Sequence, residues 1–126
     1  FTEAEGYQDS GWEVLHEKSH GEAFLWTIRN RFNKNGLFIL DEPEAALSPQ
    51  RQLACLSEMH RLVKAGCQFI VATHSPILMA YPGATILQLD AEYGPTPTKY
   101  EDTEHYRVTK GFLQNPVKML KTLLEG

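Results

Sequence analysis

The sequence has few cysteines, and the two it has are not spaced as metal ligands. Cys55 falls in a predicted helix and Cys67 at the start of a predicted strand, and no CxxC pair occurs. Both are better explained as buried thiols than as a disulfide or a metal site, which favours a reducing, cytoplasmic environment. No apolar run approaches the length that crosses a bilayer, and no signal-peptide pattern opens the chain. We therefore expect a cytoplasmic protein with no membrane partner.

A strong excess of positive charge is also lacking. The 12 Lys and Arg and the 16 Asp and Glu give a formal net charge of −4. This charge offers no electrostatic argument for nucleic acid and leaves such binding open. With 126 residues and 42% hydrophobic residues, we expect residues 1–126 to form a single domain around one core. The chain begins on Phe1 without a methionine, which suggests a piece of a longer protein.

The most informative stretch is a short apolar run that ends in two carboxylates. Leu37–Leu40 is followed directly by Asp41, Glu42 and Pro43. Such a run, preceded by Gly36, predicts a strand buried on both faces of a parallel sheet. The carboxylates then lie at its C-terminal end, where open α/β sheets bind ligands. Neighbouring side chains of an extended backbone point to opposite sides, which suits one carboxylate for a metal ion and one for an attacking water. The alternative is a strand that ends at a polar surface.

A helix and a second strand follow this run. Ser48-Pro49 is a strong signal for the start of a helix, and Gly66 is its expected end. Residues 68–72 form a second apolar run that ends just before His74. The order strand, helix, strand predicts a right-handed crossover between parallel strands, which brings His74 and the two carboxylates to one edge. We therefore predict an α/β domain with a mainly parallel sheet flanked by helices.

The remaining segments predict further helices and loops. Ser19–Glu22 fits a capping box at the start of a helix. Apolar residues at helical spacing would form its buried face: Phe24, Leu25, Ile28 and Phe32. We expect residues 1–18 to be irregular, apart from a short strand around 12–16, and residues 90–99 to form a loop. Two short helices are expected over 102–114 and 116–125, the second capped by Asn115.

Four of these motifs occur in an order typical of a known family. Ser19–Glu22, Leu37–Glu42, Glu44–Pro49 and Thr73–Ser75 resemble the second half of an ABC-type ATPase head. The resemblance covers roughly residues 12–90 and is closest to the soluble, non-transporter branch. It implies the C-terminal part of a P-loop NTPase domain that binds and hydrolyses ATP with Mg²⁺.

The resemblance implies roles for three side chains at the sheet edge. Asp41 would face Mg²⁺, a hard cation that takes oxygen ligands and keeps several waters. Glu42 would position or deprotonate the water that attacks the γ-phosphate. His74 would contact the γ-phosphate and help to orient that water. A histidine after a strand is more often just a polar loop residue, but its position one crossover after Asp41 favours the functional interpretation.

The segment Ser19–Glu22 would be the signature motif, which acts in trans in this family. The free amides of its helix N-terminus would face the phosphate held by the opposite subunit of a homodimer. Ser19 and Gly21 would contact the nucleotide, because Gly21 allows the backbone to come close. His20 and Glu22 depart from the usual pattern, in which a small residue and a glutamine are common. A plain capping box explains Ser19 and Glu22 equally well.

Residues 44–49 would be the D-loop, which passes along the seam of the homodimer. The usual aspartate is replaced by Ser48. The contact that this aspartate makes across the seam is therefore in doubt, although Ser48 remains the residue that the resemblance places there.

The family's phosphate-binding loop is missing from the sequence. The Walker A pattern GxxxxGK ends in a lysine that follows a glycine, and no lysine of this chain does so. The family's glutamine loop, which belongs to the same first half, is also missing. We therefore expect a partner segment that carries the Walker A half, and little or no ATP turnover by the 126-residue chain alone.

Two other functions compete with this interpretation. One is a non-catalytic interaction module derived from an ATPase head, although a decayed site has no need of both Asp41 and Glu42. The other is a nuclease or a different Mg²⁺ enzyme, which lacks the further carboxylates expected nearby. The process that ATP hydrolysis drives is not evident from the sequence.

Overall fold

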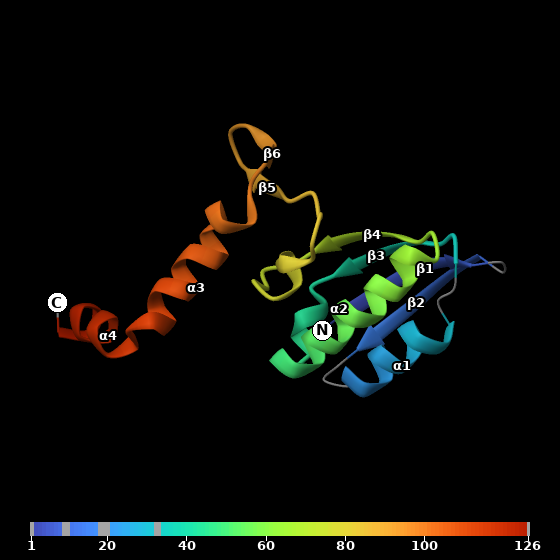
Figure 1. The fold of residues 1–126 in the computed structure, drawn as a ribbon, viewed down its shortest axis with the longest axis horizontal. Coiled ribbons are helices and arrows are strands. Elements are labelled where there is room, and N and C mark those ends of the chain that lie inside the picture. Colours follow the sequence, from blue (N-terminus) through green and yellow to red (C-terminus); the bar gives the residue numbers. More distant parts are fainter. Residues whose placement is uncertain (1, 9–10, 18–20, 32–33, 126) are drawn as a thin grey trace. The chain divides into compact units, whose positions relative to one another are not determined.

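The computed structural model describes residues 2–8, 11–17, 21–31 and 34–125, with side chains from 21–30 and 34–125. It divides into two compact units, an N-terminal unit of residues Phe1–Tyr81 and a C-terminal unit of residues Pro82–Gly126 (Figure 1). The elements of the first are β1 (Thr2–Gln8), β2 (Gly11–Glu17), α1 (Gly21–Arg31), β3 (Leu37–Asp41), η1 (Pro43–Ala46), α2 (Pro49–Lys64), β4 (Gln68–Ala72) and η2 (Leu78–Ala80). Those of the second are β5 (Leu87–Asp90), β6 (Gly94–Pro97), η3 (Tyr100–Asp102), α3 (Glu104–Gln114) and α4 (Pro116–Glu125).

The sheet of the N-terminal unit has the strand order β2-β1-β3-β4. Strands β3 and β4 are parallel, whereas β1 is antiparallel to both β2 and β3. The α/β class is confirmed, but the prediction of a mainly parallel sheet is wrong, since only β3 and β4 run parallel among the described strands. The reason lies in residues 1–18: β2 matches the short strand expected around 12–16, but β1 lies where irregular structure was expected. Strands joined by so short a connection pair antiparallel as a hairpin.

Helix α2 and the strands on either side of it form where the sequence predicted them. Ser48 has an extended backbone, and its Oγ accepts a hydrogen bond from the amide of Arg51 at 3.3 Å, as expected of an N-cap. Gly66 has a φ of 94°, and a Cβ there would lie 2.5 Å from Asn35 Oδ1. Only glycine fits this conformation without strain, which explains why the helix ends here. The chain then enters β4 parallel to β3, as predicted.

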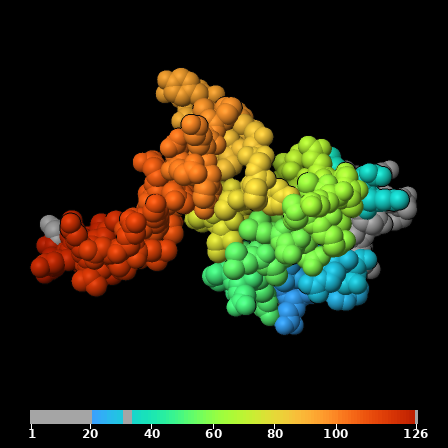
Figure 2. All heavy atoms as spheres, in the orientation of Figure 1, coloured from blue at the N-terminus to red at the C-terminus, as the bar shows by residue number. Residues whose placement is uncertain are grey.

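Both helices of the N-terminal unit pack on the same face of the sheet, and in the space-filling view they form its visible surface (Figures 1 and 2). The buried cluster comprises Phe24, Leu25, Ile28, Phe38, Leu40, Leu47, Cys55, Met59, Leu62, Cys67 and Leu78. On the opposite face of β3, Leu37 and Ile39 are 40% and 38% exposed. The prediction that this strand is buried on both faces is therefore wrong, because α1 and α2 cover only the face that bears Phe38 and Leu40.

Helix α1 presents the buried face that its spacing predicted. Phe24 and Ile28 are 0% exposed and Leu25 is 8% exposed, whereas Phe32 lies outside the described residues. These side chains join the cluster that also contains the buried residues of α2. The sheet edge described below is therefore supported from one side by a packed layer of two helices.

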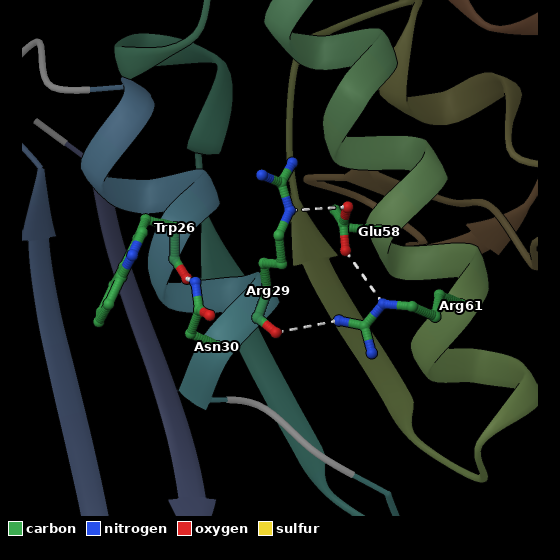
Figure 3. Close-up of polar contacts among 5 residues, drawn as sticks. All are labelled: Trp26, Arg29, Asn30, Glu58 and Arg61. Carbon is green, nitrogen blue, oxygen red and sulfur yellow. Dashed lines mark hydrogen bonds and ion pairs between the residues drawn. The ribbon is translucent and has the colours of Figure 1, made fainter.

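One ion pair and one hydrogen bond join α1 to α2 at the end away from η1 (Figure 3). The Glu58 carboxylate accepts from Arg29 Nε at 3.1 Å and from Arg61 Nε at 3.0 Å. Arg61 Nη2 also donates to the carbonyl of Arg29 at 3.4 Å. Solvent-exposed pairs of this kind contribute at most about 1 kcal/mol each. Glu58 is thus a carboxylate with two donors, remote from the loops that follow β3 and β4.

The C-terminal unit contains a hairpin where a loop was expected. Residues 90–99 include β6, which pairs antiparallel with β5. The turn is closed by Asp90 Oδ1, which accepts from the amides of Glu92 at 2.7 Å and Tyr93 at 2.9 Å. Gly94 follows with a φ of 71°. The loop prediction is wrong because this side-chain turn brings β5 and β6 together.

The two C-terminal helices begin at side-chain caps. Thr103 Oγ1 accepts the amide of Tyr106 at 3.2 Å, and Asn115 Oδ1 accepts the amide of Lys118 at 3.1 Å. The helices predicted over 102–114 and 116–125 are thus confirmed as α3 and α4, with Asn115 in its predicted role. Across the described ranges, no helix combines the length and the apolar character that a bilayer span requires.

Candidate functional site

The C-terminal ends of β3 and β4 lie at one edge of the sheet. Asp41 pairs with Ala72 in the parallel register, and the amide of Glu42 donates to the carbonyl of Ala72 at 2.7 Å. Glu42 has φ 49° and ψ 54°, a left-handed conformation that costs a non-glycine residue about 1 kcal/mol or more. This conformation turns the chain from the strand directly into η1. The loops that carry Glu42 and His74 therefore leave the sheet from the same edge.

Two of the predicted catalytic side chains lie beside each other at this edge. Glu42 Oε1 is 3.5 Å from His74 Nε2, and the two side chains are 52% and 68% exposed. Asp41, also exposed, occupies the last position of β3 immediately before Glu42. The Glu42–His74 pair is thus open to solvent, where a phosphate group could reach it, and the Asp41 carboxylate is exposed at the end of the same strand.

A third carboxylate joins the two loops, and nothing in the sequence alone singles it out. Glu44, in η1, accepts from Thr73 Oγ1 at 2.6 Å through Oε1 and from the amide of His74 at 2.7 Å through Oε2. We call this arrangement the Glu44 clamp. Its only signal in the sequence is a carboxylate two residues beyond Glu42, in the stretch interpreted as the D-loop.

Beneath the clamp, a buried polar network ties the same loops to α2. Ser75 Oγ donates to Gln52 Oε1, and Gln52 Nε2 donates to the carbonyl of Leu47 at 3.1 Å. Ser75 Oγ also accepts from the amides of Ile77 and Leu78 at 3.2 Å. Ser75 and Gln52 are 6% and 8% exposed, so an unpaired polar group here would cost about 1–3 kcal/mol. The network fixes the loop after β4 against α2.

Gly21, the first residue of α1, lies against the end of η1. A Cβ at Gly21 would lie 2.6 Å from the carbonyl oxygen of Ala46 and 3.2 Å from Leu47 Cδ2. The next residue, Glu22, pairs with Arg51 of α2 at 2.9 Å. Position 21, in the expected signature motif, therefore requires glycine, because it packs closely against Ala46 and Leu47 of the expected D-loop in the same chain. Its expected role toward a phosphate stays a prediction.

The other two predicted site residues differ in what the structure says of them. Ser48 is exposed and serves as the N-cap of α2, so its side chain already has a local partner. Ser19 lies outside the described residues, as does His20.

The edge fits magnesium only as part of a larger site. Among the side chains described, no group of three or more His, Cys, Asp or Glu residues could hold a metal ion. Mg²⁺ is commonly bound by one or two carboxylates, several waters and the phosphates of a substrate, so an exposed Asp41 carboxylate is a suitable ligand that does not suffice alone. The remaining oxygens would have to come from nucleotide and solvent.

Comparison with known proteins places this edge within a recognised family. A family model described as AAA domain, putative AbiEii toxin, type IV TA system, matches residues 18–80, which is half of the chain and includes Ser19 to His74. A protein of Haemophilus influenzae, named as an uncharacterized ABC transporter ATP-binding protein, is 32% identical over 80 residues. The aligned region is 63% of this chain and 30% of that relative. No solved structure matches the chain.

Proposed function

Because the chain belongs to the family of AAA domains described as putative AbiEii toxins of type IV TA systems, we propose that it supplies half of an ATP-hydrolysing site. The family match and the Haemophilus influenzae relative confirm the likeness to ABC-type ATPases, expected from four sequence motifs. The chain spans 30% of that relative's length, so the activity of the whole protein is part of the proposal.

The observation that carries the proposal is the approach of Glu42 to His74. The two side chains project from the loops that follow two parallel strands. Glu42 Oε1 lies 3.5 Å from His74 Nε2, and both side chains are open to solvent. Phosphoryl transfer requires positioning and charge stabilisation more than covalent chemistry from the protein. A carboxylate that can hold a water next to an imidazole that can donate to a phosphate oxygen meets that requirement.

Each side chain at the edge has a separate task in this proposal. Glu42 accepts a hydrogen bond from the attacking water and removes its proton as the water oxygen bonds to the γ-phosphorus. The bond from the γ-phosphorus to the β–γ bridging oxygen breaks, and ADP leaves. His74 donates to a γ-phosphate oxygen. Asp41 would hold Mg²⁺, directly or through its water shell, and the bound metal would neutralise charge on the β- and γ-phosphates.

The rest of the site is proposed to come from other polypeptide segments. A Walker A half would provide the phosphate cradle that this sequence lacks. A second copy would provide the signature motif, Ser19 and Gly21, in trans, with Ser48 of the D-loop at the seam of a homodimer. In this proposal residues 1–126 belong to one domain of a cytoplasmic ATPase.

The decisive experiment is to restore the missing half and remove the proposed base. We expect a protein that contains this chain together with a Walker A segment to release phosphate from ATP in a Mg²⁺-dependent manner. Glu42→Gln should lower kcat about 10²–10⁴-fold, the usual contribution of a general base. The isolated 126-residue chain should show little or no turnover.

Glu58→Gln is the matched control, because it makes the same substitution at a carboxylate of the same unit that is bound by Arg29 and Arg61, away from the sheet edge. It should leave kcat unchanged. A restored protein that is inactive, yet binds a protein partner tightly, would support the interaction module instead. An active protein that tolerates Glu42→Gln would refute the assignment of the base.

A further inference from the structure

The Glu44 clamp uses both oxygens of one carboxylate. Oε1 accepts from the hydroxyl of Thr73 at 2.6 Å, and Oε2 accepts from the amide of His74 at 2.7 Å. Hydrogen bonds to an ionised acceptor are shorter and roughly twice as strong as neutral ones. The two bonds join residues 29 and 30 positions apart along the chain, so they link the loop after β3 to the loop after β4.

The clamp acts on the backbone that carries the imidazole. The His74 side chain is 68% exposed, so its position depends heavily on the backbone from which it projects. Thr73 Oγ1, held by Glu44, in turn accepts from the amide of Ser75 at 3.0 Å. The peptide units on either side of His74 are thus both tied, directly or through Thr73, to the Glu44 carboxylate.

Backbone hydrogen bonds in the loop after β3 fix the position of Glu42. The amide of Glu42 donates a hydrogen bond to the carbonyl of Ala72, and the carbonyl of Glu42 accepts one from the amide of Ala45 at 3.0 Å. Two residues further on, Glu44 points back to the second loop. The 3.5 Å separation of Glu42 and His74 is therefore set by two short tethers, one from the backbone and one from the Glu44 side chain.

We propose that Glu44 is a positioning residue that keeps the His74 imidazole beside Glu42. This inference rests on the proposed function for its effect on turnover, but the clamp itself can be tested without nucleotide. Because both carboxylate oxygens already accept hydrogen bonds from Thr73 and His74, Glu44 acts through His74 and is assigned no contact with the reacting atoms.

The first test measures the clamp in the 126-residue chain by amide hydrogen exchange. Alanine has no side-chain acceptor, so Glu44→Ala removes both bonds. The exchange of the His74 amide should accelerate about tenfold, the factor expected for one lost hydrogen bond. Glu44→Asp, which keeps two oxygens, should restore part of the protection, and Glu58→Gln should leave it unchanged. Unaltered His74 exchange in folded Glu44→Ala would overturn the proposal.

Thr73→Val is the second variant, in case Glu44→Ala does not fold. It removes the hydroxyl donor and leaves the His74 amide bonded to Glu44. We expect the His74 amide to exchange faster than in the unaltered chain but more slowly than in the Glu44→Ala variant. The exchange of amides in the middle of α2 should not change. If Thr73→Val leaves both Ser75 and His74 exchange as in the unaltered chain, the clamp does not position this loop.

The second test measures turnover in the protein restored with a Walker A segment. Glu44→Ala should lower kcat about tenfold or more, with KM for ATP changed by no more than about twofold, because a misplaced imidazole affects the transition state and not uniform binding. Glu44→Asp should recover part of kcat. If Glu42→Gln silences the enzyme while Glu44→Ala matches Glu58→Gln, the positioning role is wrong and the proposed function stands. If Glu42→Gln is fully active, the assignment of Glu42 as the base fails, and the exchange experiment still decides the clamp.

Discussion

The two units of this chain are stabilised in different ways. All the buried hydrophobic side chains in the described part of the chain lie between Phe24 and Leu78, in the N-terminal unit. In the C-terminal unit, Leu89, Val117 and Leu124 are 81%, 78% and 79% exposed. That unit depends on interactions between residues close in the sequence: a side-chain turn, two helix caps and a hairpin. The family match ends at residue 80, so the region it covers is also the region with a core. Only the N-terminal unit has the packing that can hold side chains in a fixed geometry.

The largest expected difference between the units comes from truncating one leucine in each. Leu40, in β3, is 0% exposed, whereas Leu123, in α4, is 68% exposed. Leu40→Ala should lower the free energy of unfolding by about 2–5 kcal/mol, because it leaves a cavity. Leu123→Ala should change it by less than about 0.5 kcal/mol. Urea denaturation followed by circular dichroism measures both, and similar losses would show that α4 is packed as tightly as β3.

Two glycines provide the second comparison. Gly21→Ala should destabilise the N-terminal unit by about 1–3 kcal/mol, because the added Cβ would lie 2.6 Å from a carbonyl oxygen of Ala46. A Cβ added at Gly111, in α3, would meet no atom within 4 Å. Gly111→Ala should stabilise α3 by about 0.5–1 kcal/mol, as expected for alanine in a helix interior. Thermal unfolding of the two variants should therefore shift in opposite directions, and two shifts of the same sign would contradict this account.

The pH dependence of stability gives a third test, at a single core residue. Burial, with a smaller effect from Glu58, raises the pKa of the Cys55 thiol from 9.0 to about 12. Above pH 9 the unfolded chain loses this proton and the native chain keeps it, so stability falls as pH rises. At pH 10 the loss should be roughly 1–2 kcal/mol relative to pH 7.

Cys55→Ala serves as the reference for that measurement, because other groups also titrate above pH 9. The stability difference between the unaltered chain and Cys55→Ala should shrink by that amount between pH 7 and pH 10. A constant difference would mean that the thiol is not protected by the core. Alkylation of Cys55 at pH 8 should correspondingly require unfolding.

The smallest effect is expected in the hairpin of the C-terminal unit. The amides of Tyr93 and Glu92 lower the pKa of the exposed Asp90 carboxyl below its ordinary value. Asp90→Ala should speed amide exchange at Glu92 and Tyr93 and leave the exchange of β3 unchanged. A change that reaches β3 would show that the two units unfold as one.

The sequence was sufficient where local chemistry decides the structure. Ser48-Pro49 and Gly66 predicted the start and end of α2, and the two apolar runs around it predicted the parallel pair β3 and β4. From that connection alone, Glu42 and His74 were expected at one edge, and the structure places them 3.5 Å apart.

What the sequence did not reveal depends on partners far along the chain. The strands β1 and β2 lie in a stretch with little apolar patterning, and the antiparallel pairing of β1 with both β2 and β3 makes the sheet mixed. The exposed face of β3 could not be foreseen, because an apolar run does not say which of its faces a helix will cover. Glu44 was missed because its role exists only once Thr73 and His74 are brought to it.

A single-turnover experiment tests the central claim most directly. The protein restored with a Walker A segment is mixed, in the presence of Mg²⁺, with less ATP than protein. The fraction of bound nucleotide converted to ADP is then measured over time. We predict rapid conversion in the unaltered protein, and bound, uncleaved ATP in Glu42→Gln. Equal rates of conversion in the two proteins would contradict the account.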